Sequence, residues 1–178
     1  MGSDENKLSI LIMEEMMERG LAGMVSSPMF EENIAIVVRE NKEYDYYFIA
    51  GFSQKKKGAA SCVFITKELL DELRDESPMA KTIFLHEIGH YANSDVEIFD
   101  EKNDDRRREF VKQNKASPKE IKADEFAVGY LGRETVINGL KELKDRILAK
   151  CKDYDPESIK LSVKEIDIRI SYLLETNG

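Results

Sequence analysis

The stretch "SPMAKTIFLHEIGHYAN" limits the fold more than any other part of this chain. Its Ser77-Pro78 start is typical of a helix, because serine caps free backbone N–H groups and proline fits the first helical position. The residues that follow are apolar nearly all round a helix, as expected for a helix buried in the core. We therefore predict a buried helix from Pro78 to about Asn93.

This helix carries the sequence His86-Glu87-Ile88-Gly89-His90. Residues four apart lie on one face of a helix, so His86 and His90 can present their imidazoles to one ion. Glu87 lies about 100° further round, where it can reach a water on that ion without binding the ion itself. His-Glu-x-x-His is the pattern of zinc peptidases, in which this carboxylate takes a proton from the water.

The alternative is an ordinary core helix whose histidines happen to fall four apart. Against it, the chain has only two histidines, and both stand in the pattern. Burying them together with Glu87 would cost free energy unless they have polar partners. Gly89 is also unfavourable inside a helix by roughly 1 kcal/mol relative to alanine, which suggests that another element packs closely there.

A hydrolytic zinc site needs three protein ligands and an open position. No third histidine exists, so the remaining ligand must be a carboxylate or, as a weaker choice, a cysteine. A metzincin is excluded because Val96 stands where its third histidine would be. We predict a second helix over 118–131, on which Glu120 and Asp124 are four apart and share a face.

Glu120 has a competing structural role. Ser117-Pro118-Lys119-Glu120 is also a capping box, in which a glutamate reaches back to the N-cap backbone and needs no metal. If capping is its role, Asp124 becomes the candidate ligand and Glu125 the next. The residues alone leave these alternatives open.

The remaining pattern predicts a single α+β domain over 1–178, with a small antiparallel sheet of about three strands. β-branched and aromatic runs at 33–38 and 44–52 are typical of a β-hairpin. A third strand is expected at 59–66. The helices expected beyond the two metal-binding ones are 6–20, 67–75, about 134–150 and about 157–175.

The composition is that of a globular protein and argues against several other classes of protein. Apolar residues make up 42% and charged residues 35% of the 178 residues, as in a globular chain. The net charge of −8 argues against non-specific binding to nucleic acid or anionic lipid. No leader is recognisable, and no window approaches the roughly 18 apolar residues of a membrane span. Cys62 and Cys151 lack metal or redox spacing, so we expect reduced thiols and a cytoplasmic location.

The order "CVFITKELLDEL", "HEIGHYANSD" and "EIKADEFA" resembles the gluzincin peptidases. It is similar to the soluble catalytic core of HtpX heat-shock proteases and CAAX-prenyl endoproteases, and more loosely to BlaR-type and ImmA-like peptidases. The resemblance runs from about Cys62 to Gly132, and weakly to "EIDIRISYL". It implies a zincin-like fold with one Zn²⁺ bound by His86, His90 and Glu120. In it, Glu87 would be the base and Asp124 would orient a ligand histidine.

The resemblance also implies that a peptide or protein substrate binds as an added strand along 59–66, as a sheet edge. Members often stabilise the oxyanion with a later histidine or arginine, for which Tyr130 and Arg133 are the candidates here. The chain departs from the best-known members, which are membrane-embedded. Its charged segment 100–115 is also unusually long, and we expect a solvated helix or else a lid over the cleft.

The function predicted from the sequence is zinc-dependent peptide-bond hydrolysis by an endopeptidase. One alternative is a non-catalytic zinc module that binds a partner, with Asp124 or Cys151 as fourth ligand. Another is a regulatory protease that cleaves one specific protein. The third is a helical interaction protein whose motif is accidental.

Overall fold

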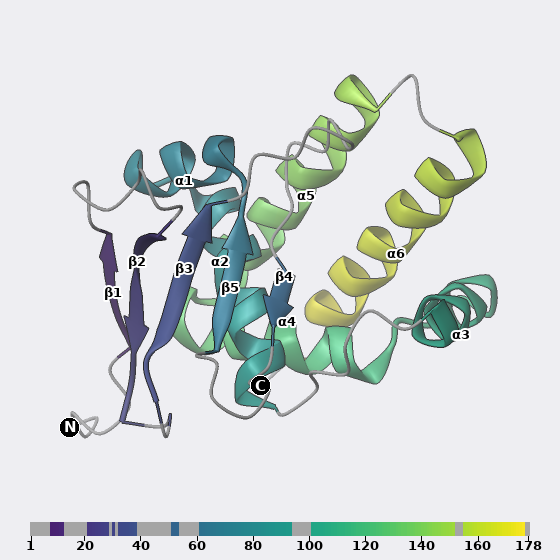
Figure 1. The fold of residues 1–178 in the computed structure, drawn as a ribbon. Coiled ribbons are helices and arrows are strands. Elements are labelled where there is room, and N and C mark those ends of the chain that lie inside the picture. The colour runs from purple at the N-terminus through teal and green to yellow at the C-terminus, as the bar shows by residue number, and fades with distance from the viewer. Residues whose placement is uncertain are drawn as a thin grey trace.

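The computed structural model describes residues 8–12, 21–28, 30, 32–38, 51–53, 61–93, 101–151 and 155–176. These form an α+β fold in which a sheet lies to one side of a group of helices (Figure 1). The strands are β1 (Ser9–Ile12), β2 (Leu21–Ser26), β3 (Ile34–Val38), β4 (Gly51–Ser53) and β5 (Cys62–Ile65). The helices are α1 (Lys67–Arg74), α2 (Pro78–Ala92), α3 (Glu101–Lys112), α4 (Pro118–Leu131), α5 (Arg133–Lys150) and α6 (Pro156–Glu175).

The sheet is larger and less regular than the sequence predicted. Its described strands have the order β1-β2-β3-β5-β4, and β3 pairs with β5 in parallel while the other neighbours are antiparallel. The predictions of about three strands and of a purely antiparallel sheet were therefore wrong. The predicted hairpin was wrong as well, because β5 lies between β3 and β4. Alternating apolar residues indicate a strand but do not show which strands it pairs with. Here β5 occupies the interior of the sheet, and its Val63 and Ile65 are fully buried.

The predicted helix over 6–20 was wrong where the structure describes it. Residues Ser9–Ile12 form β1, which pairs with β2 in antiparallel register so that Ile12 lies opposite Gly23. Apolar residues at positions 8, 10 and 12 also suit one face of a strand, and Leu8 and Ile12 pack on the sheet. Pairing with β2 therefore decides the conformation of this segment. Residues 13–20 of the predicted helix and 44–50 of the predicted strand lie outside the described residues.

The helices of the second half follow the sequence closely. As predicted, α2, α4 and α6 each begin at a proline that follows serine or aspartate. The side chains of Ser77 and Asp155 accept hydrogen bonds from backbone N–H groups in the first turns of α2 and α6. The helices expected at 67–75, about 134–150 and about 157–175 are confirmed as α1, α5 and α6.

Helix α2 lies between two apolar cores. Phe84 and Ile88 are fully buried in a core shared with the sheet and α1. Leu85 points instead into a second core, formed with α4, α5 and α6. This double burial explains why α2 is apolar nearly all round, and it confirms the buried helix predicted from the sequence.

No helix among the described residues is both long and apolar enough to cross a membrane.

Candidate metal centre

Close packing of α2 on α4 brings the candidate ligands together. A Cβ atom built on Gly89 would lie 2.9 Å from both the Cα and the carbonyl oxygen of Ala123. Only glycine lets the two backbones approach this closely without a shift. The close contact inferred from Gly89 in the sequence is therefore confirmed, and the element that packs there is α4.

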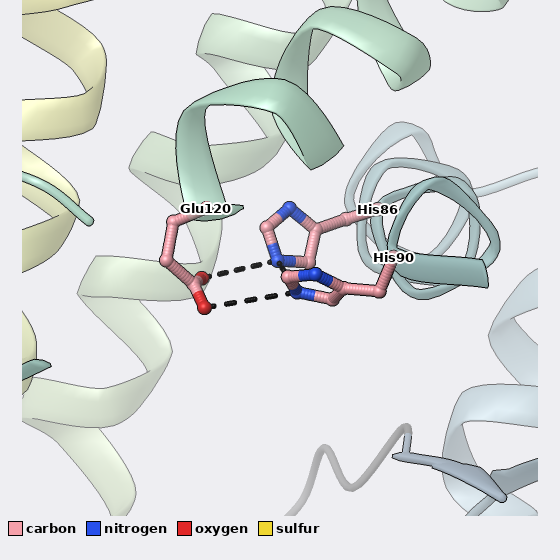
Figure 2. Close-up of side chains that lie close together, drawn as sticks. All are labelled: His86, His90 and Glu120. Atoms are coloured by element: carbon pink, nitrogen blue, oxygen red, sulfur yellow. Dashed lines mark hydrogen bonds and ion pairs between the residues drawn. The ribbon is translucent and has the colours of Figure 1, made fainter. Parts of the chain in front are cut away.

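Three side chains converge at this contact, and Figure 2 shows the Glu120 carboxylate facing both imidazoles. The Nε2 atoms of His86 and His90 are 3.1 Å apart. Glu120 places Oε2 at 3.2 Å from Nε2 of His86 and Oε1 at 3.6 Å from Nε2 of His90. Ligand atoms around a tetrahedral zinc ion are separated by about 3.3 Å. His86, His90 and Glu120, hereafter the ligand group, could thus hold a metal ion with little rearrangement.

The structure distinguishes among Glu120, Asp124 and Glu125, the three carboxylates that the sequence left as candidates for the third ligand. The Ser117 side chain makes no capping hydrogen bond, and Glu120 is buried with its carboxylate turned to the histidines instead of capping α4. Asp124 lies on the other side of His86, and Glu125 is exposed and accepts a hydrogen bond from Tyr172. Glu120 is therefore the carboxylate that joins both Nε2 atoms.

Asp124 determines which nitrogen of His86 faces the ligand group. Its Oδ1 is 2.8 Å from Nδ1 of His86, and a carboxylate in this position accepts the Nδ1 proton. Once His86 gives up its second proton to bind an ion, that tautomer leaves the Nε2 lone pair directed at the ligand group. Asp124 is itself fully buried, so the contact is shielded from water.

Arg169 on α6 supports Asp124, and sequence reasoning missed it. Its Nε donates to Oδ2 of Asp124 at 2.7 Å, and its Nη2 donates to Oδ1 at 2.5 Å. Its Nη1 lies 3.5 Å from Oε2 of Glu120. A signal was present in "EIDIRISYL", because Arg169 falls on the same helical stripe as buried Ile166 and Ile170. A charge on an apolar stripe is rarely buried without a partner.

A second arginine reaches the site from the charged segment. Helix α3 is largely exposed at positions 106–109, as expected for a solvated helix. Arg107 nevertheless donates from Nε to both carboxylate oxygens of Glu165, at 2.7 and 2.9 Å. Its Nη2 lies 3.6 Å from Oε2 of Glu120. Nothing in the arginine run itself indicates which of its residues would contact a candidate ligand.

The two histidines have opposite affinities for protons. Burial and Arg169 lower the pKa of His86, but Asp124 and Glu120 outweigh them and raise it to about 9. Burial and the charge of His86 lower the pKa of His90 to about 4. Burial opposes ionisation of Glu120, yet His86 and the arginines hold its pKa well below the usual range. Without a metal, His86 is therefore the histidine that carries an extra proton at neutral pH, and His90 is neutral.

Glu87 stands apart from these ion pairs. It is half-buried on α2, and among the described residues it has no hydrogen-bond or ion-pair partner. Burial raises its pKa to about 7, against the lowering effect of the His86 charge. A carboxylate with this pKa can exchange a proton near neutral pH.

The charges of the whole arrangement favour a divalent cation. We call it the polar cluster: it consists of the ligand group with Glu87, Asp124, Glu165, Arg107 and Arg169. With neutral histidines and ionised acids, four carboxylates face two guanidinium groups, and two negative charges remain. A divalent ion would neutralise them, and otherwise protons must do so. Both the donor types and the charge thus suit a metal.

The candidates for oxyanion stabilisation do not belong to the ligand group. Tyr130 packs its ring on Phe126, and it lies ten residues beyond Glu120, or about 15 Å along α4. Arg133 donates to the backbone carbonyl of Thr176 at the end of α6. Cys151, at the end of α5, also lies outside the ligand group.

The expected edge strand 59–66 requires a correction. Its described part is β5, which is paired with β3 on one side and with β4 on the other. An added peptide strand needs free backbone N–H and C=O groups, and these pairings use both edges of β5. In the described sheet, the outer strands are β1 and β4.

No protein-family model, curated protein or solved structure matches this chain. The likeness to gluzincin peptidases therefore remains a prediction from the motifs. What indicates a metal site is the ligand group itself.

Proposed function

We propose that this protein is a zinc-dependent peptidase of the gluzincin type, acting as an endopeptidase. The observation that carries the proposal is Glu87, a half-buried carboxylate that is close enough to His86 and Glu120 for their charges to shift its pKa, yet has no hydrogen-bond or ion-pair partner among the described residues. A metal site that only joined helices would have no use for it. A hydrolytic site requires such a group.

Each residue then has a separate task. His86, His90 and Glu120 hold the ion, and Asp124 with Arg169 keeps His86 in the tautomer that offers Nε2. Bound zinc would supply an activated water and polarise the scissile carbonyl. Glu87 accepts the proton of the attacking water and passes it to the leaving amine. In the metal-free site, burial raises the pKa of Glu87 to about 7, and the ionised form that a bound cation would favour is the one that accepts this proton.

The substrate in this proposal is an extended peptide segment that adds to the sheet. Among the described strands, β4 pairs only with β5, and it contacts α2, which carries the histidines. We therefore assign the outer edge of β4, in place of 59–66, as the strand along which a peptide lies.

Metal content tests the ligand assignment. Elemental analysis of protein purified without chelator should give one zinc per chain for the wild type and none for His86→Ala or Glu120→Ala. Glu125→Ala is the matched control, because this exposed carboxylate lies on the same helix and points elsewhere. Zinc retained by Glu120→Ala would reject Glu120 as a ligand. A wild type that takes up no zinc would end the peptidase proposal.

Glu87→Gln tests catalysis separately from metal binding. The amide has nearly the same size but cannot accept the proton, so zinc content should be unchanged while peptide hydrolysis falls about 10²–10⁴-fold. A zinc-replete Gln variant with wild-type turnover would contradict the assignment of Glu87 as base.

The rival proposal of a non-catalytic zinc module needs a fourth protein ligand. Among the described residues, the ligand group has only three members. Asp124 faces Nδ1 of His86, on the other side of the ring from the Nε2 atom in the ligand group. The geometry therefore favours an open position, as hydrolysis requires.

A further inference from the structure

The arginines of the run Arg106–Arg108 differ in what they contact. Arg106 and Arg108 are exposed on α3, and neither has a hydrogen bond to a described residue. Arg108 lines a pocket against α6, but of the three only Arg107 forms a hydrogen-bonded pair there, a bidentate one with Glu165. Figure 1 shows α3 beside α6, at the opposite end of the molecule from β1. The charged segment is thus tied to the polar cluster through one side chain.

Glu165 is the residue that needs this contact. It is only 5% exposed, and among the described residues Arg107 is the sole hydrogen-bond partner of its carboxylate. Arg107 itself is nearly half exposed and could be solvated without a partner. A buried carboxylate without a partner is strongly unfavourable, so Glu165 would seek another cation if Arg107 were removed.

The nearest alternative cation on the same helix is Arg169. It follows Glu165 by four residues, the spacing at which oppositely charged side chains on a helix pair readily. Arg169 is already engaged with Asp124, at 2.7 and 2.5 Å, and through it with His86. An unpaired Glu165 would therefore compete with Asp124 for the guanidinium that maintains the orientation of His86.

We propose that Arg107 is a positioning residue for the metal site: by pairing with Glu165, it leaves Arg169 to Asp124 and so keeps His86 and Glu120 in place for the ion. This inference rests on the metal site of the proposed function, but not on hydrolysis. It gives the charged segment a structural link to the site that neither a solvated helix nor a simple lid would have.

The test is zinc affinity, measured by competition with a chromophoric chelator on the full chain. Arg107→Ala should bind zinc about 10–100-fold more weakly, as is usual when a residue supporting a ligand is lost. Arg106→Ala and Arg108→Ala remove the same charge from the same helix and should leave the affinity unchanged. If Arg107 acted only by repelling the ion, its removal would instead tighten binding, and the proposal would fail.

The double variant Arg107→Ala/Glu165→Gln shows whether Arg107 acts by positioning the metal ligands or only by stabilising α3 against α6. It removes the competing carboxylate and keeps the net charge of the polar cluster, so it should recover most of the lost affinity. The visible spectrum of the Co²⁺-loaded protein should change in Arg107→Ala and return in the double variant. No recovery in either readout would overturn the proposal.

The outcomes also distinguish this inference from the proposed function. A wild type that binds zinc, with rescue as described but no hydrolysis of any peptide, would support the positioning role and reject the peptidase. If the wild type hydrolyses peptides and Arg107→Ala changes neither hydrolysis nor zinc affinity, the peptidase proposal would be supported and the positioning role of Arg107 would be rejected. A wild type without zinc affinity would reject both.

Discussion

The two sides of α2 have opposite chemistry although they belong to one helix. Toward the sheet, Phe84 and Ile88 pack among fully buried aliphatic side chains. Toward α4 and α6, His86 and His90 face carboxylates and guanidinium groups. The first side is held by shape and apolar area. On the second side, the apolar core around Leu85 is joined by a network of buried charges linked by hydrogen bonds and ion pairs.

This difference determines what a mutation should do on each side. An apolar core tolerates exchange between residues of similar volume, because its contacts are not directional. A buried ion network does not, since removing one member leaves another charge without compensation. Loss of stability alone cannot distinguish the two sides, but its dependence on pH and on metal can.

Arg169→Met should have the largest effect on the metal-free protein. Methionine fills similar space but leaves Asp124 buried without its main cation and removes one of the cations near Glu120, which should lower the free energy of unfolding by about 3–5 kcal/mol. Ile36→Ala is the control on the sheet side, where a cavity should cost about 2–5 kcal/mol. Urea unfolding near pH 7 measures both.

The pH dependence then separates these two variants. Burial raises the pKa of Asp124, but Arg169 and His86 lower it further, to about 2, below its ordinary value. This contribution to stability is therefore present above the ordinary pKa of about 3.9 and lost as the pH falls toward 2. The deficit of Arg169→Met should shrink on acidification, while that of Ile36→Ala should stay constant. A constant deficit in both would mean that the network does not act through charge.

The sequence predicted best what depends on local rules. Serine or aspartate before proline located the starts of α2, α4 and α6, because capping and the fixed proline φ act within one turn. The two histidines needed only helical spacing to come together. The choice of Glu120 followed from the family resemblance and agrees with its placement, whereas the residues alone had left the capping alternative open.

What depends on distant segments could not be predicted in the same way. Residues Ser9–Ile12 become a strand because β2 is available to pair with them, which no property of the segment itself reveals. The position of β5 inside the sheet is likewise a property of its neighbours. Arg107 lies 58 residues from its partner Glu165, and its neighbours in the arginine run look identical in sequence. Only the packing of α3 on α6 distinguishes it.

Gly89→Ala should give the next largest effect, because it tests how closely the polar side is fitted together. The added methyl group would lie 2.9 Å from the Ala123 backbone and must push α2 and α4 apart, at a cost of about 1–3 kcal/mol in stability. Zinc affinity should fall as well, since Glu120 moves away from the histidines with α4. Thermal unfolding and chelator competition measure the two effects.

Gly129→Ala is the matched control on α4. Among the described residues, no atom outside the neighbouring turns of α4 lies within 4 Å of its added Cβ, and alanine favours a helix over glycine by about 1 kcal/mol. This variant should therefore be slightly more stable and bind zinc normally. Equal loss of zinc affinity in both glycine variants would refute the idea that the helix contact sets the ligand geometry.

The pH dependence of zinc affinity should reveal the protons that the ion replaces. His86, with a pKa of about 9, is protonated in the metal-free site below pH 9 and must lose that proton when the ion binds. Glu87, with a pKa of about 7, carries a proton only below pH 7, so binding releases a second proton only in that range. The affinity should therefore rise with pH by about two decades per unit near pH 6 and about one decade near pH 8. Glu87→Gln should rise by about one decade per unit throughout. A slope that is the same for both proteins near pH 6 would show that Glu87 does not respond to the ion.

The smallest effect should come from an ion pair at the surface of the helices that also contribute to the polar side of the molecule. Lys144 on α5 lies 2.6 Å from Asp167 on α6, and both side chains reach solvent. Lys144→Ala should cost only about 0.2–1 kcal/mol, because water solvates the remaining carboxylate. Lys141→Ala, which removes an exposed lysine from the same helix, corrects for the loss of charge alone. The difference between them should vanish at high salt, since exposed charges are screened. If Lys144→Ala instead lowered the free energy of unfolding as much as Arg169→Met, the contribution of an ion pair to stability in this fold would not depend on its burial.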